Sequence, residues 1–247
     1  MSDIRISIAN KVYGSTQQDD QFHHAIAELN FTVHPDQFVC LVGPSGCGKT
    51  TLLNMIAGLD SHYEGQIDVG RSGIIPSIGY VFQNPRLLPW HSVRQNIELV
   101  FAGQPKTELI DGLLDSMQLR DVEHQYPERL SLGMQRRVSI IRAFAVEADI
   151  LLMDEPFVSL DAPTARQVRS LLYSLWQQRP HTVLFVTHDL REAIALADRL
   201  IFLSPSPMRI VSDIGVDIAR DQRHDESRIE YFREQLLRHH PEIDGLL

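Results

Sequence analysis

Hydrophobic residues recur along the chain in two patterns. Continuous apolar runs of about five residues are typical of strands buried on both faces of a parallel sheet; they occupy "FVCLV" (38–42), "IGYVFQ" (78–83), "DILLM" (149–153), "TVLFVTH" (182–188) and "RLIFL" (199–203). Apolar residues spaced three or four apart predict helices between these runs: "KTTLLNMIAGL" (49–59), 136–146, a helix beginning at Pro163, and "REAIALA" (191–197). Strands alternating with helices predict an α/β fold around a helix-covered parallel sheet.

The rest of the chain has a different texture. Alternation in "LNFTVH" (29–34) predicts an antiparallel strand within residues 1–35. From Asn84 to about Leu130 short helical patterns are broken by prolines, which predicts a helical insertion. The tail after about Ser204 is polar, and we expect it to be loosely packed.

Composition narrows the class of protein. The chain has 247 residues, 43% of them hydrophobic, so it can bury a sizeable core. A formal net charge of −9 argues against broad nucleic-acid binding. Cys40 and Cys47 lack metal-ligand spacing, and two cysteines fit a reducing cytosol better than a disulfide framework. Neither a membrane-spanning run nor a signal-peptide pattern is expected.

The segment "GPSGCGKTT" (43–51) matches the phosphate-loop pattern G-x-x-x-x-G-K-[ST] between a predicted strand and a helix. Its glycines leave backbone N–H groups open to a polyphosphate, and the helix N-terminus adds partial positive charge. Lys49 can reach the β- and γ-phosphates, and Thr50 can offer its hydroxyl to Mg²⁺. A glycine-rich turn without a ligand is the alternative. The residues expected to bind nucleotide are Gly43, Pro44, Ser45, Gly46, Cys47, Gly48, Lys49, Thr50 and Thr51.

Polar residues follow three of the predicted strands. Asp154 and Glu155 end "DILLMDEP", where a parallel sheet presents ligands at its carboxyl edge. We expect Asp154 to hold Mg²⁺ and Glu155 to take a proton from an attacking water; a helix cap is the alternative. Gln83 could touch Mg²⁺ or that water, and His188 could contact the γ-phosphate, although a lone residue at a strand end is more often structural.

Taken together, six ordered segments resemble the ATP-binding subunit of ABC transporters: "GPSGCGKTT", "VFQ", "LSLGMQRR", "ILLMDEP", "SLDA" and "VTHD". The resemblance spans about residues 4–210. It implies a P-loop NTPase (RecA-like) core with an N-terminal antiparallel β subdomain and a helical subdomain at about 84–135. The whole chain, 1–247, would form a single ABC ATPase domain with a short polar tail from about residue 212.

The resemblance also implies partners for the site residues. Ser131 and Gly133 would contact the γ-phosphate of ATP held by a second copy of the chain, so that two copies sandwich the nucleotides. Tyr13 occupies the place of the aromatic residue that stacks on adenine. Asp161 would lie at the dimer interface. The expected cofactors are ATP and Mg²⁺.

The signature segment departs from the family pattern "LSGGQ", because Leu132 replaces a glycine and Met134 a glutamine. A left-handed backbone would cost leucine roughly 1–2 kcal/mol. After an N-cap serine, however, a helix needs only right-handed dihedrals, which leucine accepts. We therefore predict a working signature. The "HPDQF" segment (34–38), where the family usually has Pro-Gly-Glu, predicts only a local turn change.

The segment "NPRLLPWHSVRQNI" (84–97) is similar to nitrate, sulfonate and taurine importers. This likeness implies a peripheral position on the cytoplasmic face of the membrane, permease contacts within about 84–100, and an indirect link to a solute-binding protein. Leu87, Leu88 and Trp90 are candidate docking residues, or they simply pack the helical insertion. The alternatives are a soluble ABC ATPase of DNA repair or translation and a P-loop kinase. The transported solute stays open.

Overall fold

The computed structural model describes residues 3–14, 22–70 and 76–246. Two compact units make up the chain: the first contains residues 1–75 and 182–247, and the second contains residues 76–181. Among the described residues, none of the helices combines the length and apolar character needed to cross a bilayer.

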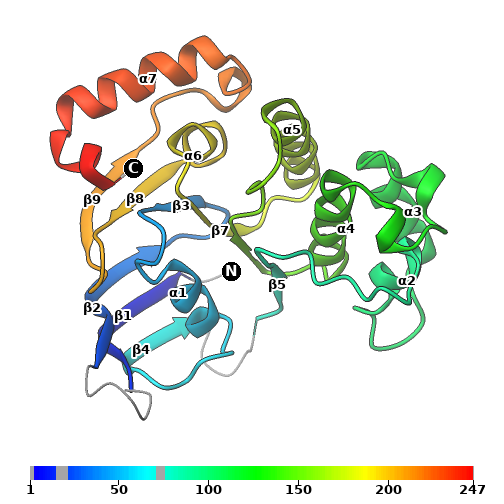
Figure 1. Cartoon of the computed structure of the whole chain (residues 1–247), viewed down its shortest axis with the longest axis horizontal. Coiled ribbons are helices and arrows are strands. Elements are labelled where there is room, and N and C mark those ends of the chain that lie inside the picture. The colour runs from blue at the N-terminus through cyan, green and yellow to red at the C-terminus, as the bar shows by residue number, and fades with distance from the viewer. Residues whose placement is uncertain (1–2, 15–21, 71–75, 247) are drawn as a thin grey trace. The chain divides into compact units, whose positions relative to one another are not determined.

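An antiparallel sheet lies in the first unit, in the order β2-β1-β4 (Figure 1). Its strands are β1 (Ile4–Tyr13), β2 (His23–Val33) and β4 (Glu64–Val69). Ile4, Ile6 and Ile8 alternate with exposed residues along β1, so one face of the sheet is buried. The predicted antiparallel strand is confirmed as part of β2.

Parallel strands form the other part of the first unit. The buried strand β3 (Phe38–Val42) lies between β7 (Thr182–Thr187) and β8 (Arg199–Leu203), and both neighbours are parallel to it. An antiparallel strand, β9 (Ile210–Gly215), pairs with β8. The helices α1 (Lys49–Ile56) and α6 (Leu190–Leu196) complete this part. The helix predicted within 49–59 is confirmed as α1, and Gly58, which the sequence indicates as its stop, turns the chain with φ +71° and leaves Leu59 64% exposed.

The C-terminal segment is ordered, so the prediction of a loosely packed tail is wrong. After β9 come the 3₁₀ turn η3 (Arg220–Gln222), α7 (Glu226–His239) and η4 (Pro241–Leu246). Ile229, Leu236 and Ile243 are buried, and the buried Arg223 guanidinium donates to the carbonyl oxygen of Ala197 at 2.7 Å. A few buried apolar residues hold α7 against the rest of the unit. The polar composition of the tail did not reveal this helix.

The second unit pairs β5 (Ile78–Val81) with β6 (Ile150–Asp154) in parallel. Its helices and 3₁₀ turns are α2 (Val93–Glu98), α3 (Thr107–Ser116), η1 (Arg120–Val122), η2 (Pro127–Arg129), α4 (Leu132–Ala145) and α5 (Ala162–Gln178). The short helices between residues 84 and 130 match the predicted helical insertion. In α5, Val168, Leu172 and Trp176 are buried at the predicted spacing.

Candidate nucleotide site

The phosphate loop connects β3 to α1 through two glycines in left-handed conformations. Gly46 has φ +79° and Gly48 has φ +110°. A Cβ atom at Gly48 would also lie 3.3 Å from the Ala25 carbonyl oxygen. These two positions favour glycine because side chains rarely adopt such dihedrals.

Lys49 begins α1 and is buried inside the loop. Its ammonium donates hydrogen bonds to the carbonyl oxygens of Gly43 at 2.7 Å and Pro44 at 2.9 Å. This holds a positive charge beside the loop backbone and at the N-terminus of α1, where an anion is favoured. Thr50 is exposed at the next position.

Both cysteines are buried thiols. Cys47 is 1% exposed within the loop, so its thiol is shielded from solvent. Burial raises the pKa of Cys40 well above its ordinary value; the charge of Glu192 adds to the rise and that of Lys49 opposes it.

Two further predicted residues lie in the same unit as the phosphate loop. The Tyr13 hydroxyl is 3.0 Å from the hydroxyl of Thr51 in α1, which ties the tyrosine to the helix that follows the loop. His188 follows β7 directly and is exposed. Because Val42 pairs with Thr187, His188 and Gly43 leave neighbouring parallel strands at the same edge.

The second unit carries the two carboxylates at the end of β6. Asp154 is the last residue of that strand and is buried. Glu155 comes next, half-buried, with φ +43°, a conformation that costs a non-glycine residue about 1–3 kcal/mol and is concentrated at functional sites. Val81 pairs with Met153, so the exposed Gln83 follows the neighbouring strand at the same edge.

Buried groups surround these carboxylates. Burial raises the pKa of Tyr80, and the charge of Asp154 raises it further, so the phenol keeps its proton. Arg136 of α4 is buried and donates to the carbonyl oxygens of Phe82 at 3.2 Å and Val158 at 3.4 Å. Burial lowers its pKa, while Asp154 and Glu155 raise it. Arg136 thus links the signature helix to the chain before Gln83 and to the chain after Glu155.

The signature turn is a capped helix start. Ser131 is the N-cap of α4, and its hydroxyl accepts a hydrogen bond of 3.2 Å from the Met134 amide. Leu132 is the first residue of the helix, so its backbone is right-handed. Its side chain is exposed. The prediction that leucine fits this backbone position is confirmed.

Gly133 is constrained by packing against α5. A Cβ atom there would lie 2.7 Å from Cγ2 of Thr164. The Thr164 amide and hydroxyl donate to the two carboxylate oxygens of Asp161 at 3.0 and 2.7 Å. Both hydrogen bonds lower the pKa of Asp161, and the bond from the amide has the larger effect. Within the second unit, Thr164 therefore joins Gly133 to Asp161.

Sequence reasoning missed three residues that organise this unit: Arg136, Thr164 and Asn96. The buried Asn96 amide donates to the carbonyl oxygens of Leu88, His91 and Ser92, and its Oδ1 accepts from the Leu88 amide. A capping box formed by Ser92 and Gln95 was readable as Ser-x-x-Gln. The partners of Arg136, and the contact of Thr164 with Gly133, gave no local signal because these residues are distant from one another in sequence.

The residues predicted to hold Mg²⁺ carry suitable donor atoms, each within its own unit. Thr50, Gln83 and Asp154 offer oxygen atoms, which hard cations prefer. The described residues contain no cluster of three or more His, Cys, Asp or Glu side chains placed to hold a metal. Mg²⁺ needs no such cage, because phosphates and waters complete its shell.

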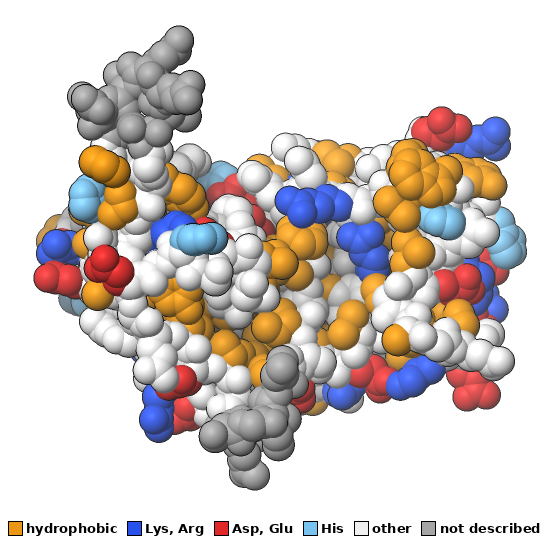
Figure 2. Space-filling view, turned by 90° about the horizontal axis from the view of Figure 1, so that it is seen from below, with side chains coloured by type: hydrophobic (Ala, Val, Ile, Leu, Met, Phe, Trp, Pro, Cys, Tyr) orange, Lys and Arg blue, Asp and Glu red, His pale blue; other side chains and the backbone are white. Residues whose placement is uncertain are grey.

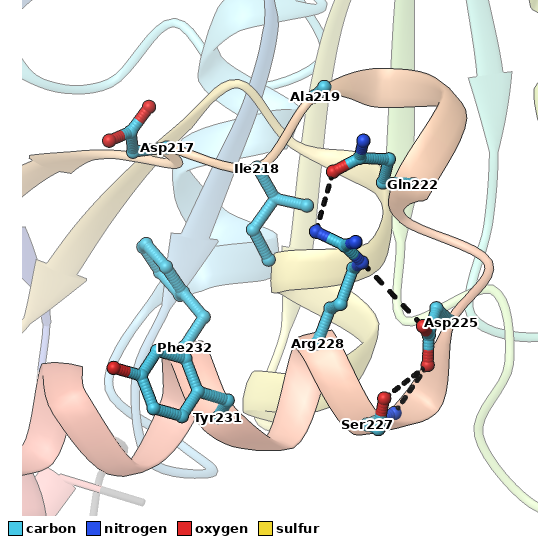
Figure 3. A pocket seen from close by; sticks show the side chains of 9 residues that line it. All are labelled: Asp217, Ile218, Ala219, Gln222, Asp225, Ser227, Arg228, Tyr231 and Phe232. Carbon is cyan, nitrogen blue, oxygen red and sulfur yellow. Dashed lines mark hydrogen bonds and ion pairs between the residues drawn. The ribbon is translucent and has the colours of Figure 1, made fainter.

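A separate cavity of about 610 Å³ lies in the C-terminal part of the first unit (Figure 3). Tyr231 and Phe232 of α7 line it together with the segment before η3. Arg228 donates to the Gln222 side chain at 2.7 Å across its wall. None of the residues predicted to bind nucleotide lines this cavity.

Comparison with known proteins agrees with these motifs. The ABC transporter family model matches residues 26–158. An aliphatic sulfonates import ATP-binding protein, SsuB, of Bacillus licheniformis is 39% identical over 218 residues, covering 86% of each chain. A taurine import ATP-binding protein, TauB, of Escherichia coli is 40% identical over 204 residues, covering 79% of this chain and 80% of the relative.

A solved structure has the same fold. It is the dimeric post-hydrolysis state of the ATP-binding cassette MJ0796 bound to ADP and Pi, with a TM-score of 0.75 and 27% identity, covering 87% of this chain and all of that one. The family model matches more than half of the sequence, and the curated relatives extend over most of it. The chain therefore belongs to the ABC transporter family, as the six ordered motifs predicted.

Proposed function

We propose that this chain is the ATP-binding and ATP-hydrolysing subunit of an importer for a small sulfonate of the aliphatic or taurine type. The observation that carries the ATPase activity is the phosphate loop, with its left-handed glycines and buried Lys49. The relatives SsuB and TauB, which are ATP-binding proteins of aliphatic sulfonate and taurine import, support the solute class.

The proposed chemistry gives each of the predicted residues its own role. The phosphate-loop amides and Lys49 bind the phosphates, and Tyr13 stacks on adenine. Thr50, Gln83 and Asp154 would hold Mg²⁺, which neutralises phosphate charge when bound. Glu155 takes a proton from the water that attacks the γ-phosphorus, and the bond to the ADP oxygen breaks. His188 donates a hydrogen bond to the γ-phosphate.

A second copy of the chain completes each site in this proposal. Ser131 and Gly133 of one copy contact ATP on the other copy, with Asp161 at the interface. The exposed Ser131 hydroxyl at the N-terminus of α4 supports this role, since helix N-termini favour phosphate. The dimeric state of the related MJ0796 cassette supports the two-copy arrangement.

We further propose that residues 84–100 contact permease subunits at the cytoplasmic face of the membrane, with a solute-binding protein reached only through them. Trp90 is 67% exposed, and Leu87 and Leu88 are half-buried. Asn96 holds the backbone beneath them, as described above. Figure 2 shows one face of the molecule, on which hydrophobic side chains lie among charged ones. In this proposal residues 1–247 act as one cassette, with 84–135 as its helical subdomain.

Glu155→Gln tests the proposed hydrolysis. The variant should bind ATP but hydrolyse it about 10²- to 10⁴-fold more slowly, because the general base is lost, and it should accumulate as an ATP-bound dimer. Glu147→Gln is the matched control: Glu147 also has positive φ, but it pairs with Arg179 at 3.1 Å. Near-normal turnover in Glu155→Gln would remove Glu155 as the base.

Trp90→Ala tests the permease contact. In the reconstituted importer it should lower sulfonate transport per ATP hydrolysed. Tyr231→Ala removes an aromatic ring of similar exposure, 65%, from α7 and should leave this ratio unchanged. Full transport by Trp90→Ala would assign Trp90 to packing alone.

A further inference from the structure

Lys11 is a buried cation beside the tyrosine proposed to stack on adenine. Its side chain is 3% exposed. The ammonium lies 2.8 Å from a carboxylate oxygen of Asp60 and donates to the His62 carbonyl oxygen at 2.7 Å. It also lies 4.6 Å from the centre of the Tyr13 ring. The other carboxylate oxygen of Asp60 lies 2.9 Å away, so oxygen atoms hold the ammonium in place over the Tyr13 ring.

The strand is built to bring these two side chains together. Ile4, Ile6 and Ile8 are buried in strict alternation, but the next buried residue is Lys11 rather than Asn10. The pairing with β4 shifts between Ile8 and Asn10, and a bulge of this kind moves later side chains to the other face. Lys11 and Tyr13, two residues apart, then lie on one face of β1.

The carboxylate of Asp60 forms an ion pair with the Lys11 ammonium. Burial raises the pKa of Asp60, but hydrogen bonds from Lys11 and from the His62 amide outweigh burial and bring the pKa below its ordinary value. The ring above the ammonium is also restrained, because the Tyr13 hydroxyl is bonded to Thr51.

We propose that Lys11 is a positioning residue for nucleotide binding: it occupies one face of the Tyr13 ring and leaves the other face for adenine. This inference rests on the proposed stacking of Tyr13. The cation draws π-electron density toward its own face, which weakens the repulsion between the opposite face and an electron-rich purine. The Tyr13 ring is thereby connected to α1 through its hydroxyl and to Asp60 through Lys11.

The test is a double-mutant cycle with binding measured by calorimetry. Lys11→Met should weaken ATP binding about three- to tenfold, with no change in the affinity for inorganic tripolyphosphate, which lacks a base. Lys11→Arg should restore ATP affinity, because it keeps the cation. In a Tyr13→Leu background, Lys11→Met should have no further effect on ATP affinity.

The outcomes separate the possible failures. Equal losses for ATP and tripolyphosphate, or the same loss from Lys11→Met with and without Tyr13, would overturn the inference and leave Lys11 as a support of the fold. If Tyr13→Leu binds ATP as tightly as the native chain, the stacking assignment itself fails, and the inference with it. If Lys11→Met does not fold, Lys11→Met/Asp60→Asn removes the unpaired carboxylate and allows the same comparison.

Discussion

The phosphate loop and the signature turn both lead into a helix that is proposed to face phosphate, but they begin that helix differently. Gly48 starts α1 from a left-handed backbone and without a side-chain cap. Ser131 starts α4 from an extended backbone, and its hydroxyl caps the helix. The first turn depends on glycine for its conformation, whereas the second depends on serine for its hydrogen bond.

This difference explains why the signature tolerates an unusual residue. Leu132 occupies a helical position that any L-residue can adopt, while Gly46 and Gly48 occupy positions that disfavour side chains. Gly133 is a third case: its helical backbone needs no glycine, but Thr164 leaves no room for a Cβ atom. A glycine position in a motif can therefore need glycine for its dihedral angles, need it for lack of space, or accept another residue.

The largest expected effect is on the charge held in the phosphate loop. Lys49→Ala removes charge-assisted hydrogen bonds to phosphate, and we expect ATP affinity to fall about 10- to 100-fold, since such a bond contributes about 1.5–3 kcal/mol. Equilibrium binding of labelled ATP measures this. Lys106→Ala, at an exposed lysine paired with Glu147, is the control. Unchanged nucleotide affinity in Lys49→Ala would reject the phosphate-loop assignment.

The next effect tests the spatial constraint at Gly133. Gly133→Ala should lower the free energy of unfolding by about 1–3 kcal/mol through overpacking against Thr164. Thr164→Ser removes the opposing methyl group and keeps the hydroxyl that bonds Asp161, so it should rescue Gly133→Ala in urea denaturation. Equal instability of the single and double variants would show that Thr164 is not the obstacle.

A smaller effect is expected from the conformational constraint at Gly48. Gly48→Ala should cost about 1–2 kcal/mol of stability because its φ of +110° strains a side chain, and ATP affinity should fall as the loop adjusts. Gly112→Ala is the control, since it lies within α3 and a Cβ atom there meets nothing within 4 Å. Thermal unfolding should separate the two variants, and equal melting temperatures would contradict this reading.

The smallest effect should come from Leu132. Leu132→Gly is expected to destabilise α4 by at most about 1 kcal/mol through helix propensity, with ATP-driven dimerisation unchanged. Gel filtration with ATP in the slowly hydrolysing Glu155→Gln background compares the two signatures. If dimers formed only with glycine at 132, the leucine signature would be defective and the comparison between the two turns would fail.

Much of the secondary structure and the phosphate loop could be predicted from short stretches of sequence. The apolar run 38–42 became β3 without change, and the glycine spacing around Lys49 identified a phosphate loop because strand, turn and helix follow one another in sequence. The C-terminal tail could not be read in this way. On α7 the buried residues Ile229 and Leu236 lie about two helical turns apart, and mostly polar and charged residues stand between them.

The sequence by itself determined which residues are proposed to carry the chemistry, since each motif is a short stretch of backbone that fixes the order of its phosphate-loop, carboxylate or cap residues. Only the tertiary structure decided which other residues contact and support them. Lys11 meets Asp60 across 49 positions, Arg136 meets Phe82 across 54, and Thr164 reaches Gly133 from another helix. Such pairs depend on how strands and helices pack, and packing brings together residues whose separation in sequence carries no periodic signal.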